Sequence, residues 1–260
     1  MALLKKLLRD QEYAAQQARY GLDAPEMTVY HREIILRKKF IKKLYLDWYR
    51  EIMSRVNQAG KVLELGAGGG FLKEIYPAVI TSDILPLPNC DMTINAYQLP
   101  FLNHELAAIV MINTLHHLGE CEKFFHEAER TLKRGGKIVM LEPANTVWSR
   151  FVYKNFHHEP FNEKMTGWNF PSTGPMSVAN GALPWMVFVR DRKKFQTRFP
   201  RLKIQSVKLH TPFRYLISGG LSYKSLLPYW MYTPVKVLER MLSPAISVLA
   251  MFQTIELIKE

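Results

Sequence analysis

The stretch VLELGAGGGFLKEI, residues 62–75, decides the fold of this chain. It begins as a short apolar strand, passes an acidic residue at Glu64, and continues through glycines at positions 66, 68, 69 and 70 before helix-forming residues resume near Phe71. Glycine allows a sharp turn and lets a ligand approach the main chain, and the start of a helix offers free N–H groups to polar ligands. The stretch therefore predicts a nucleotide-type cofactor site in an open α/β sheet.

The spacing of the glycines distinguishes two kinds of cofactor site. A dinucleotide site follows G-x-G-x-x-G, but Phe71 stands where that pattern has its third glycine. The chain instead reads E-x-G-x-G-x-G, which resembles motif I of the class I S-adenosyl-L-methionine (SAM)-dependent methyltransferases. The resemblance implies that the acid and the turn hold the methionine part of SAM, through Glu64, Gly66, Ala67, Gly68 and Gly70. A glycine-rich turn without a ligand is the alternative.

Two further segments extend this resemblance toward the rest of the cofactor. Asp83 ends a predicted strand over residues 78–82, where an ionised carboxylate can accept hydrogen bonds from ribose hydroxyls; a simple turn acid is the alternative. Asn95 and Ala96 precede an LPF turn at residues 99–101 and resemble the acid-Ala pair that contacts adenine in the family. Asn95 replaces the usual acid, but its amide oxygen can still accept a hydrogen bond from the adenine amino group.

Paired histidines follow the predicted strand over residues 107–112, in the sequence Asn113-Thr114-Leu115-His116-His117. The carboxyl ends of strands carry the chemistry in open α/β sheets. The pair resembles the "HH" of the group called methyltransferase type 11, which implies that Asn113 and His116 line the cofactor and that His117 is the first candidate for a catalytic base. The alternative is that the histidines only pack against the cofactor or the fold.

The run AERTLKRGGKIVMLEP, residues 128–143, resembles the family segment that ends one helix and forms the next strand. We expect a helix over residues 121–132, a stop at residues 133–136 and a strand over residues 137–141. Glu142 follows that strand and is expected to orient one of the histidines. The combined resemblance covers about residues 60–143.

These segments predict a doubly wound, Rossmann-like α/β fold with seven strands, the last of them antiparallel. The late strands are expected over residues 203–210 and 249–258. Residues 1–59 would form a helical N-terminal cap, with an amphipathic helix over residues 1–19 and a longer helix over residues 28–57. Residues 60–260 would form the methyltransferase domain, with substrate-side insertions at about residues 144–183 and 211–247. A basic amphipathic helix is expected over residues 185–199.

The first insertion contains His157, His158 and Glu159 in succession. Adjacent side chains point apart and the two cysteines lack metal-binding spacing, so we predict no metal site. His157 and His158 stay as candidates for a substrate-side base or hydrogen-bonding role, with a local structural role as the alternative.

Charge and hydropathy indicate the partners. The chain is 48% hydrophobic with a net charge of +12, and residues 144–260 alone carry +10. A basic field attracts nucleic acid, anionic lipid surfaces or phosphorylated metabolites, but ordinary solubilising charge is an equal alternative. We find no secretory signal and no apolar run of transmembrane length, so we expect a cytoplasmic protein. The aromatic residues of the second insertion leave contact with a membrane surface open.

The function predicted is SAM-dependent methyl transfer to an oxygen or nitrogen of a small or amphipathic metabolite, such as a glycan or lipid-linked intermediate. RNA methylation is the first alternative. Against it, the chain has no recognisable RNA-binding module, and NTLHH stands where nucleic-acid amino methylases have an asparagine-proline motif. The second alternative is a SAM-binding protein without catalysis. Labelling of RNA would favour the first alternative, and cofactor binding without turnover would favour the second.

Overall fold

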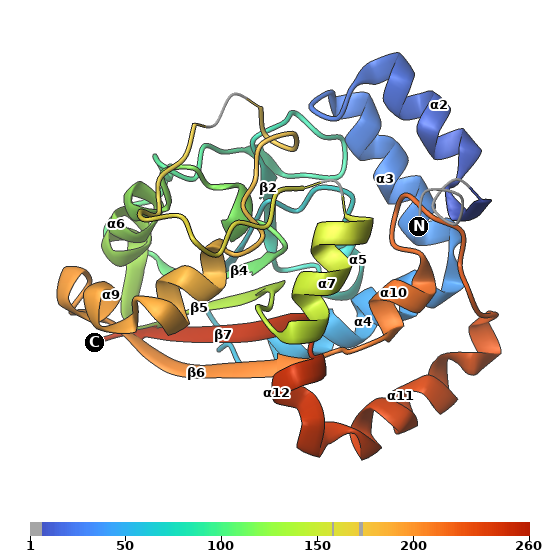
Figure 1. The fold of residues 1–260 in the computed structure, drawn as a ribbon. Helices are drawn as coiled ribbons and strands as arrows, with labels where there is room; N and C mark the ends of the chain where they lie inside the picture. Colours follow the sequence, from blue (N-terminus) through green and yellow to red (C-terminus); the bar gives the residue numbers. More distant parts are fainter. Residues whose placement is uncertain (1–6, 158, 172–173) are drawn as a thin grey trace.

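The structure is a computed structural model that describes residues 7–157, 159–171 and 174–260. A seven-stranded sheet with the order β3-β2-β1-β4-β5-β7-β6 runs through its centre (Figure 1). The strands are β1 Lys61–Leu65, β2 Ile80–Asp83, β3 Met92–Thr93, β4 Leu106–Ile112, β5 Leu132–Pro143, β6 Leu202–His210 and β7 Phe252–Lys259. Strands β1 to β5 pair in parallel, whereas β7 is antiparallel to both β5 and β6. The predicted doubly wound fold is confirmed.

The direction of the strands positions the site. Strands β1 and β4 lie next to each other, and β4 has five fully buried residues out of seven because helices cover both faces of the parallel sheet. Parallel strands deliver their carboxyl ends to one edge. The loops that follow β1, β2, β4 and β5 therefore meet at that edge.

The helices differ from the prediction mainly in their continuity. Those described are α2 Gln11–Tyr20, α3 Pro25–Arg37, α4 Lys39–Met53, α5 Leu72–Ile75, α6 Cys121–Thr131, α7 Val147–Phe156, α8 Leu183–Trp185, α9 Arg192–Arg198, α10 Arg214–Ser218, α11 Tyr232–Met241 and α12 Ile246–Leu249. The single helix expected over residues 28–57 is wrong, because Lys38 adopts an extended conformation between α3 and α4. Its ammonium donates to the carbonyl of Tyr223 at 2.6 Å, a contact that a local pattern cannot reveal.

The expected N-terminal helix is interrupted at residues 9 and 10. Residues 1–6 lie outside the described residues, and the continuous helix over residues 1–19 is wrong at its centre, because Arg9 forms a backbone bridge with Tyr223. The next residue, Asp10, caps α2 by accepting hydrogen bonds from the amides of Glu12 and Tyr13. This segment is therefore held by a distant loop rather than by helical pairing.

Residues 185–199 do not form one regular helix. A π-helical turn, Met186–Arg190, separates α8 from α9, and Asp191 follows it with a carboxylate that accepts from the Trp168 indole. The inward face was predicted correctly, since Val187, Phe188, Phe195 and Phe199 are all fully buried. The predicted helix stop at residues 133–136 instead belongs to β5, which begins at Leu132.

One hydrophobic core joins α4 to the sheet, through Trp48, Tyr49 and Ile52 among others. The predicted division at residue 59, between a helical cap and a methyltransferase domain, stays a prediction.

In the second insertion, Tyr232 is buried while Trp230 and Met241 are more than 70% exposed. No helix in the described ranges has the length and hydropathy needed to cross a bilayer, and membrane-surface contact stays a prediction.

Replacement of Gly69 tests whether α3 packs against the glycine turn. A Cβ atom built on Gly69 would lie 2.7 Å from the backbone nitrogen of Arg32 in α3, and backbone cannot move aside as a side-chain tip can. We expect Gly69→Ala to lower the free energy of unfolding by about 1–3 kcal/mol in urea titrations.

Gly167→Ala is the matched control, because its Cβ would meet only the Asn169 nitrogen, at 4.0 Å. We expect that variant to unfold within about 1 kcal/mol of the unmodified chain. Equal midpoints for the two variants would mean that α3 does not pack on the glycine turn.

Candidate active site

A cavity of about 610 Å³ runs along the carboxyl ends of β1, β2 and β4. Most of the residues predicted for the site line it: Glu64, Gly66, Ala67, Gly68, Gly70, Asp83, Asn95, Ala96, Asn113, His116, His117 and His157. Glu142 is fully buried behind the wall instead, and His158 lies outside the described residues. The structure thus brings two separately predicted groups, the glycine turn and the histidines, to one cavity.

The glycine turn wraps around Asp83. The amide of Gly68 donates to Oδ2 of Asp83 at 2.9 Å, and the amide of Leu85 donates to Oδ1 at 3.0 Å. Gly68 has a φ of +49°, a left-handed conformation that glycine adopts without strain. Burial raises the pKa of Asp83, although these two amides work in the opposite direction. Each carboxylate oxygen keeps lone-pair capacity for a ligand hydroxyl.

Two buried oxygens at the ends of β1 and β4 have no hydrogen-bond partner among the described residues. They are Oε2 of Glu64 and Oδ1 of Asn113, and both side chains line the cavity. Burial and the charge of Asp83 raise the pKa of Glu64 to about 8. A buried polar atom without a partner costs free energy, so these oxygens suit a ligand that donates hydrogen bonds or carries positive charge.

The expected adenine contact is less direct. The side-chain oxygen of Asn95 accepts a hydrogen bond from the amide of Tyr97 at 2.9 Å, so this oxygen already closes a local turn. Ala96 is buried in the cavity wall, and Ile84, which is half exposed, also lines the cavity. The role of Asn95 toward adenine stays a prediction.

The N-terminal helices contribute cavity residues that sequence reasoning missed. Thr28 and His31 of α3 line the cavity, and both are buried. Tyr49 of α4 accepts a hydrogen bond from the amide of Phe71 at 3.0 Å, which holds the start of α5. No local pattern marks these residues, because they reach the cofactor turn only through tertiary packing.

Glu142 anchors the turn that carries the histidines. This turn is a 3₁₀ helix, Leu115–His117, directly after β4. One oxygen of Glu142 accepts from the amides of Thr114 and Leu115 at 2.9 and 2.7 Å, and the other lies 2.6 Å from Nδ1 of His116. Nδ1 of His117 instead lies 3.2 Å from the carbonyl oxygen of Val178. The histidine that Glu142 contacts is therefore His116.

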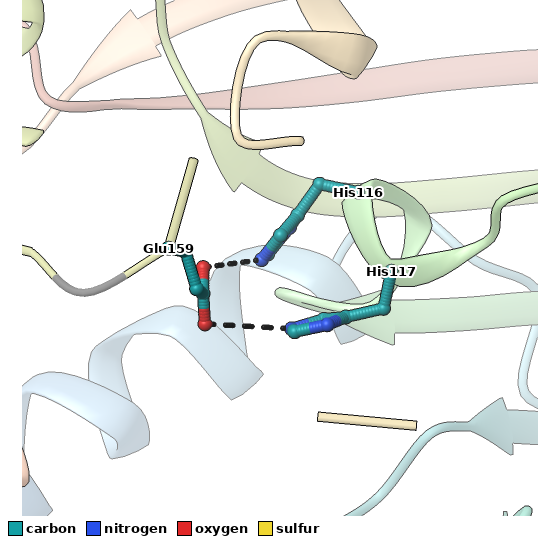
Figure 2. Close-up of side chains that lie close together, drawn as sticks. All are labelled: His116, His117 and Glu159. Carbon is teal, nitrogen blue, oxygen red and sulfur yellow. Dashed lines mark ion pairs between the residues drawn. The ribbon is translucent and has the colours of Figure 1, made fainter. Parts of the chain in front are cut away.

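Glu159 from the first insertion faces both histidines (Figure 2). Its Oε2 lies 3.2 Å from Nε2 of His116, and its Oε1 lies 3.6 Å from Nε2 of His117. His157 is also near, with Nδ1 3.6 Å from Oε2 of Glu159. The sequence had placed Glu159 only beside His157 and His158, whereas the fold moves it to the end of β4.

The two histidines have opposite ionisation. Burial disfavours the charged form of His116, but the carboxylates of Glu142 and Glu159 outweigh it and raise the pKa of His116 to about 10. Burial and the charge of His116 lower the pKa of His117 to about 4. Burial opposes ionisation of Glu159 as well, yet the three nearby histidines hold its pKa well below the usual range. At neutral pH the described groups are thus a cation, a neutral imidazole and a carboxylate.

Beyond the histidines the cavity becomes an apolar chamber. Its walls come from α7, α10, the loop after α10 and the start of β7: Val152, Tyr153, Phe156, Tyr215, Leu216, Leu221, Leu226, Met251 and Phe252. The segment at residues 8–10 crosses beside it, where the amide of Asp10 donates to the carbonyl of Ser222 and the amide of Lys224 donates to that of Leu8. In Figure 1 the loop after α10, drawn in orange, lies beside the N-terminal helices.

Comparison with known proteins agrees with this geometry. Residues 63–140 match a family model described as a methyltransferase domain, and this segment holds the glycine turn, Asp83 and both histidines. A search of curated proteins finds no significant match.

Among solved structures, the chain is similar to geranyl diphosphate C-methyltransferase from Streptomyces coelicolor A3(2), with 13% identity, 92% of this chain and 87% of that chain covered, and a TM-score of 0.48. Phosphoethanolamine N-methyltransferase 2 from Haemonchus contortus shows 12% identity, 91% and 57% coverage, and a TM-score of 0.49. An S-adenosylmethionine-dependent methyltransferase from Mesorhizobium loti shows 13% identity, 80% and 96% coverage, and a TM-score of 0.46. The segment matched at the centre of the chain is thus a methyltransferase domain.

Proposed function

We propose that this methyltransferase acts on an oxygen or nitrogen atom of a small amphipathic molecule. The observation that carries the proposal is the continuity of one cavity, from the glycine turn past His116 and His117 into the apolar chamber. A cofactor at the turn and an acceptor in the chamber would meet beside the histidines. Such a site works mainly by positioning the acceptor and excluding water.

The residues at the turn fit SAM. Glu64 offers an unpartnered carboxyl oxygen to a cationic amino group, Asn113 offers an unpartnered amide oxygen, and Asp83 has lone pairs left for ribose hydroxyls. When bound, SAM supplies an activated methyl group on a positively charged sulfur. The chain would orient this group and keep the region dry through the buried walls of the cavity.

The lining of the cavity favours a small acceptor over RNA. Three carboxylates line it, Glu64, Asp83 and Glu159, whereas among the described lining residues Lys224 is the one lysine and arginine does not occur. The basic surplus of the sequence therefore lies elsewhere on the molecule. Since a phosphate backbone needs basic contacts along its path, this lining supports a neutral or cationic amphipathic acceptor.

Cofactor affinity should depend on the two acidic residues at the turn. We expect Glu64→Gln and Asp83→Asn each to weaken SAM binding about tenfold or more in calorimetric titrations, because each loses charge or acceptor capacity toward the ligand. Glu105→Gln, at the opposite edge of the sheet, is the control and should bind as the unmodified chain does. Unchanged SAM affinity in both turn variants would mean that SAM does not bind in this cavity.

The raised pKa of Glu64 predicts a pH dependence of stability. Glutamate titrates near 4.5 when unfolded and at about 8 here, so the stability that this carboxyl contributes is complete below about pH 4.5 and is lost as the pH rises through about 8. Between pH 5 and pH 8, the unmodified chain should lose up to about 1.4 kcal/mol per pH unit relative to Glu64→Gln. Urea unfolding of both proteins without ligand measures this; parallel pH profiles would contradict the burial of Glu64.

Labelled methyl transfer tests the acceptor class. With radiolabelled SAM and cell extracts separated into lipid, glycan and RNA fractions, we expect label in a small lipid-soluble or glycan-linked product. On that acceptor, Phe156→Ala should raise KM roughly 5- to 100-fold, because the aromatic ring lines the chamber, while SAM affinity stays unchanged.

Phe151→Ala is the control on the same helix, since Phe151 is 46% exposed and does not line the cavity. Equal KM values for the two variants would place the acceptor outside the chamber. Label confined to RNA would support the RNA alternative, and SAM binding without label in any fraction would support a non-catalytic protein.

A further inference from the structure

Three ligand-type atoms converge at one point of the cavity. They are Nε2 of His116, Nε2 of His117 and a carboxylate oxygen of Glu159, and all lie within 4.8 Å of one another. Figure 2 shows the two rings leaving the same turn and pointing at the same carboxylate. Each of the three side chains lines the cavity, so the point between them is open to ligands.

In each ring the contact made by Nδ1 leaves Nε2 as the atom that faces the metal position. A backbone carbonyl can only accept, so the contact of His117 with the Val178 oxygen places the proton on Nδ1 and leaves a lone pair on Nε2. Nδ1 of His116 is held by the carboxylate of Glu142 at 2.6 Å, and a metal ion at Nε2 would displace the proton that this ring carries without metal. Histidine ligands of metals almost always have their second nitrogen engaged by a carboxylate or a carbonyl in this manner.

The separation of His117 and Glu159 also suits a bound cation. The distance from Nε2 of His117 to Oε1 of Glu159 is 3.6 Å, which is too long for a hydrogen bond. With the proton of His117 on Nδ1, two electron-pair donors face each other across this gap. A cation placed between them would be coordinated by both.

The two histidine ligands are held in place before any ion arrives. Glu142 is fully buried and accepts from the amides of Thr114 and Leu115, so it fixes the turn as well as the ring of His116. The carbonyl of His116 accepts from the amide of Asn180 at 2.8 Å. Rigid support of this kind is what a metal site requires, because ligand geometry then costs little on binding.

We propose that His116, His117 and Glu159 bind one divalent first-row transition metal ion, with zinc as the best match. Two imidazole nitrogens and one carboxylate are a typical ligand set of catalytic zinc, which keeps a further coordination position for water or substrate. The sequence prediction of no metal considers the adjacent residues His157, His158 and Glu159, whose side chains are expected to point apart. In the 3₁₀ turn the rings of His116 and His117 instead lie 4.3 Å apart at 38°, so their Nε2 atoms reach one carboxylate.

The site also suggests a role for the ion in catalysis. Its remaining position would face the cavity, where an oxygen of the acceptor could bind and lose its proton more readily than in water. This role rests on the proposed function, whereas metal binding itself does not.

Metal binding can be measured without any acceptor. The full chain would be stripped with a chelator and titrated with Zn²⁺, and Co²⁺ would serve as a coloured probe of the ligand field. We expect one ion per chain by elemental analysis, a visible Co²⁺ spectrum of low coordination number, and a Zn²⁺-dependent rise in melting temperature.

Glu159→Gln and His117→Ala should each weaken Zn²⁺ binding about 100-fold or more, because each removes a ligand. Glu159→Gln is nearly isosteric, and its melting temperature without metal would show whether it is folded. His126→Gln is the control, since His126 is an exposed histidine on α6 outside the cavity. Equal Zn²⁺ affinity in the folded Glu159→Gln variant and in the control would overturn the site, as would a chain that takes up no Zn²⁺ or Co²⁺.

The two proposals can fail separately. A stripped chain that methylates its acceptor at full rate and binds no metal would overturn the metal site and leave the proposed function. A chain that binds one Zn²⁺ through these residues but labels no acceptor would support the metal site and overturn the proposed function.

Discussion

The buried carboxylate of Glu142 is the contact on which the arrangement of this site depends. It lies at the end of β5, fully buried, and makes hydrogen bonds to two backbone amides and one imidazole of the loop after β4. A buried carboxylate is tolerated only when such donors surround it. These hydrogen bonds hold the loop in one conformation and fix the ring of His116. The position of His117 and the approach of Glu159 follow from that turn.

The cavity is lined by acidic residues, whereas the whole chain is basic. The protein has a net charge of +12, yet Glu64, Asp83 and Glu159 line the cavity. Carboxyl groups in a region of low solvent access favour positively charged ligands, because Coulomb attraction is less screened there than in water. A sulfonium cofactor and a divalent metal ion are both cations. The same feature therefore underlies both proposals for this site.

The N-terminal helices form part of the cavity wall. The backbone of α3 lies so close to Gly69 that a methyl group would not fit, and Thr28 and His31 extend from this helix into the cavity. The break at Lys38 lets its ammonium bind the loop near residue 220, and residues 8–10 pair with that loop as well. The N-terminal segment and the second insertion thus enclose the cavity together.

Much of the fold could be predicted from the sequence because it depends on short-range chemistry. The strands around residues 62–65 and 107–112 show the apolar runs of a parallel sheet, and the glycine turn marks the cofactor edge between them. Asp83 and the paired histidines follow strands directly, so their place at the carboxyl edge follows from strand direction alone. The split of the helix over residues 28–57 could not be seen, because its cause is a contact of Lys38 with a loop more than 180 residues later.

The sequence by itself determined the succession of strands along the chain and the residues at the carboxyl edge of the sheet, since local periodicity and turn residues encode them. Only the tertiary structure decided that Thr28 and Tyr49 meet the glycine turn and that Glu159 faces His116 and His117 instead of acting with the histidines beside it. The physical reason is that these contacts join segments more than twenty residues apart along the chain. Burial, hydrogen-bond satisfaction and charge balance in the folded core select them, and no local pattern carries that information.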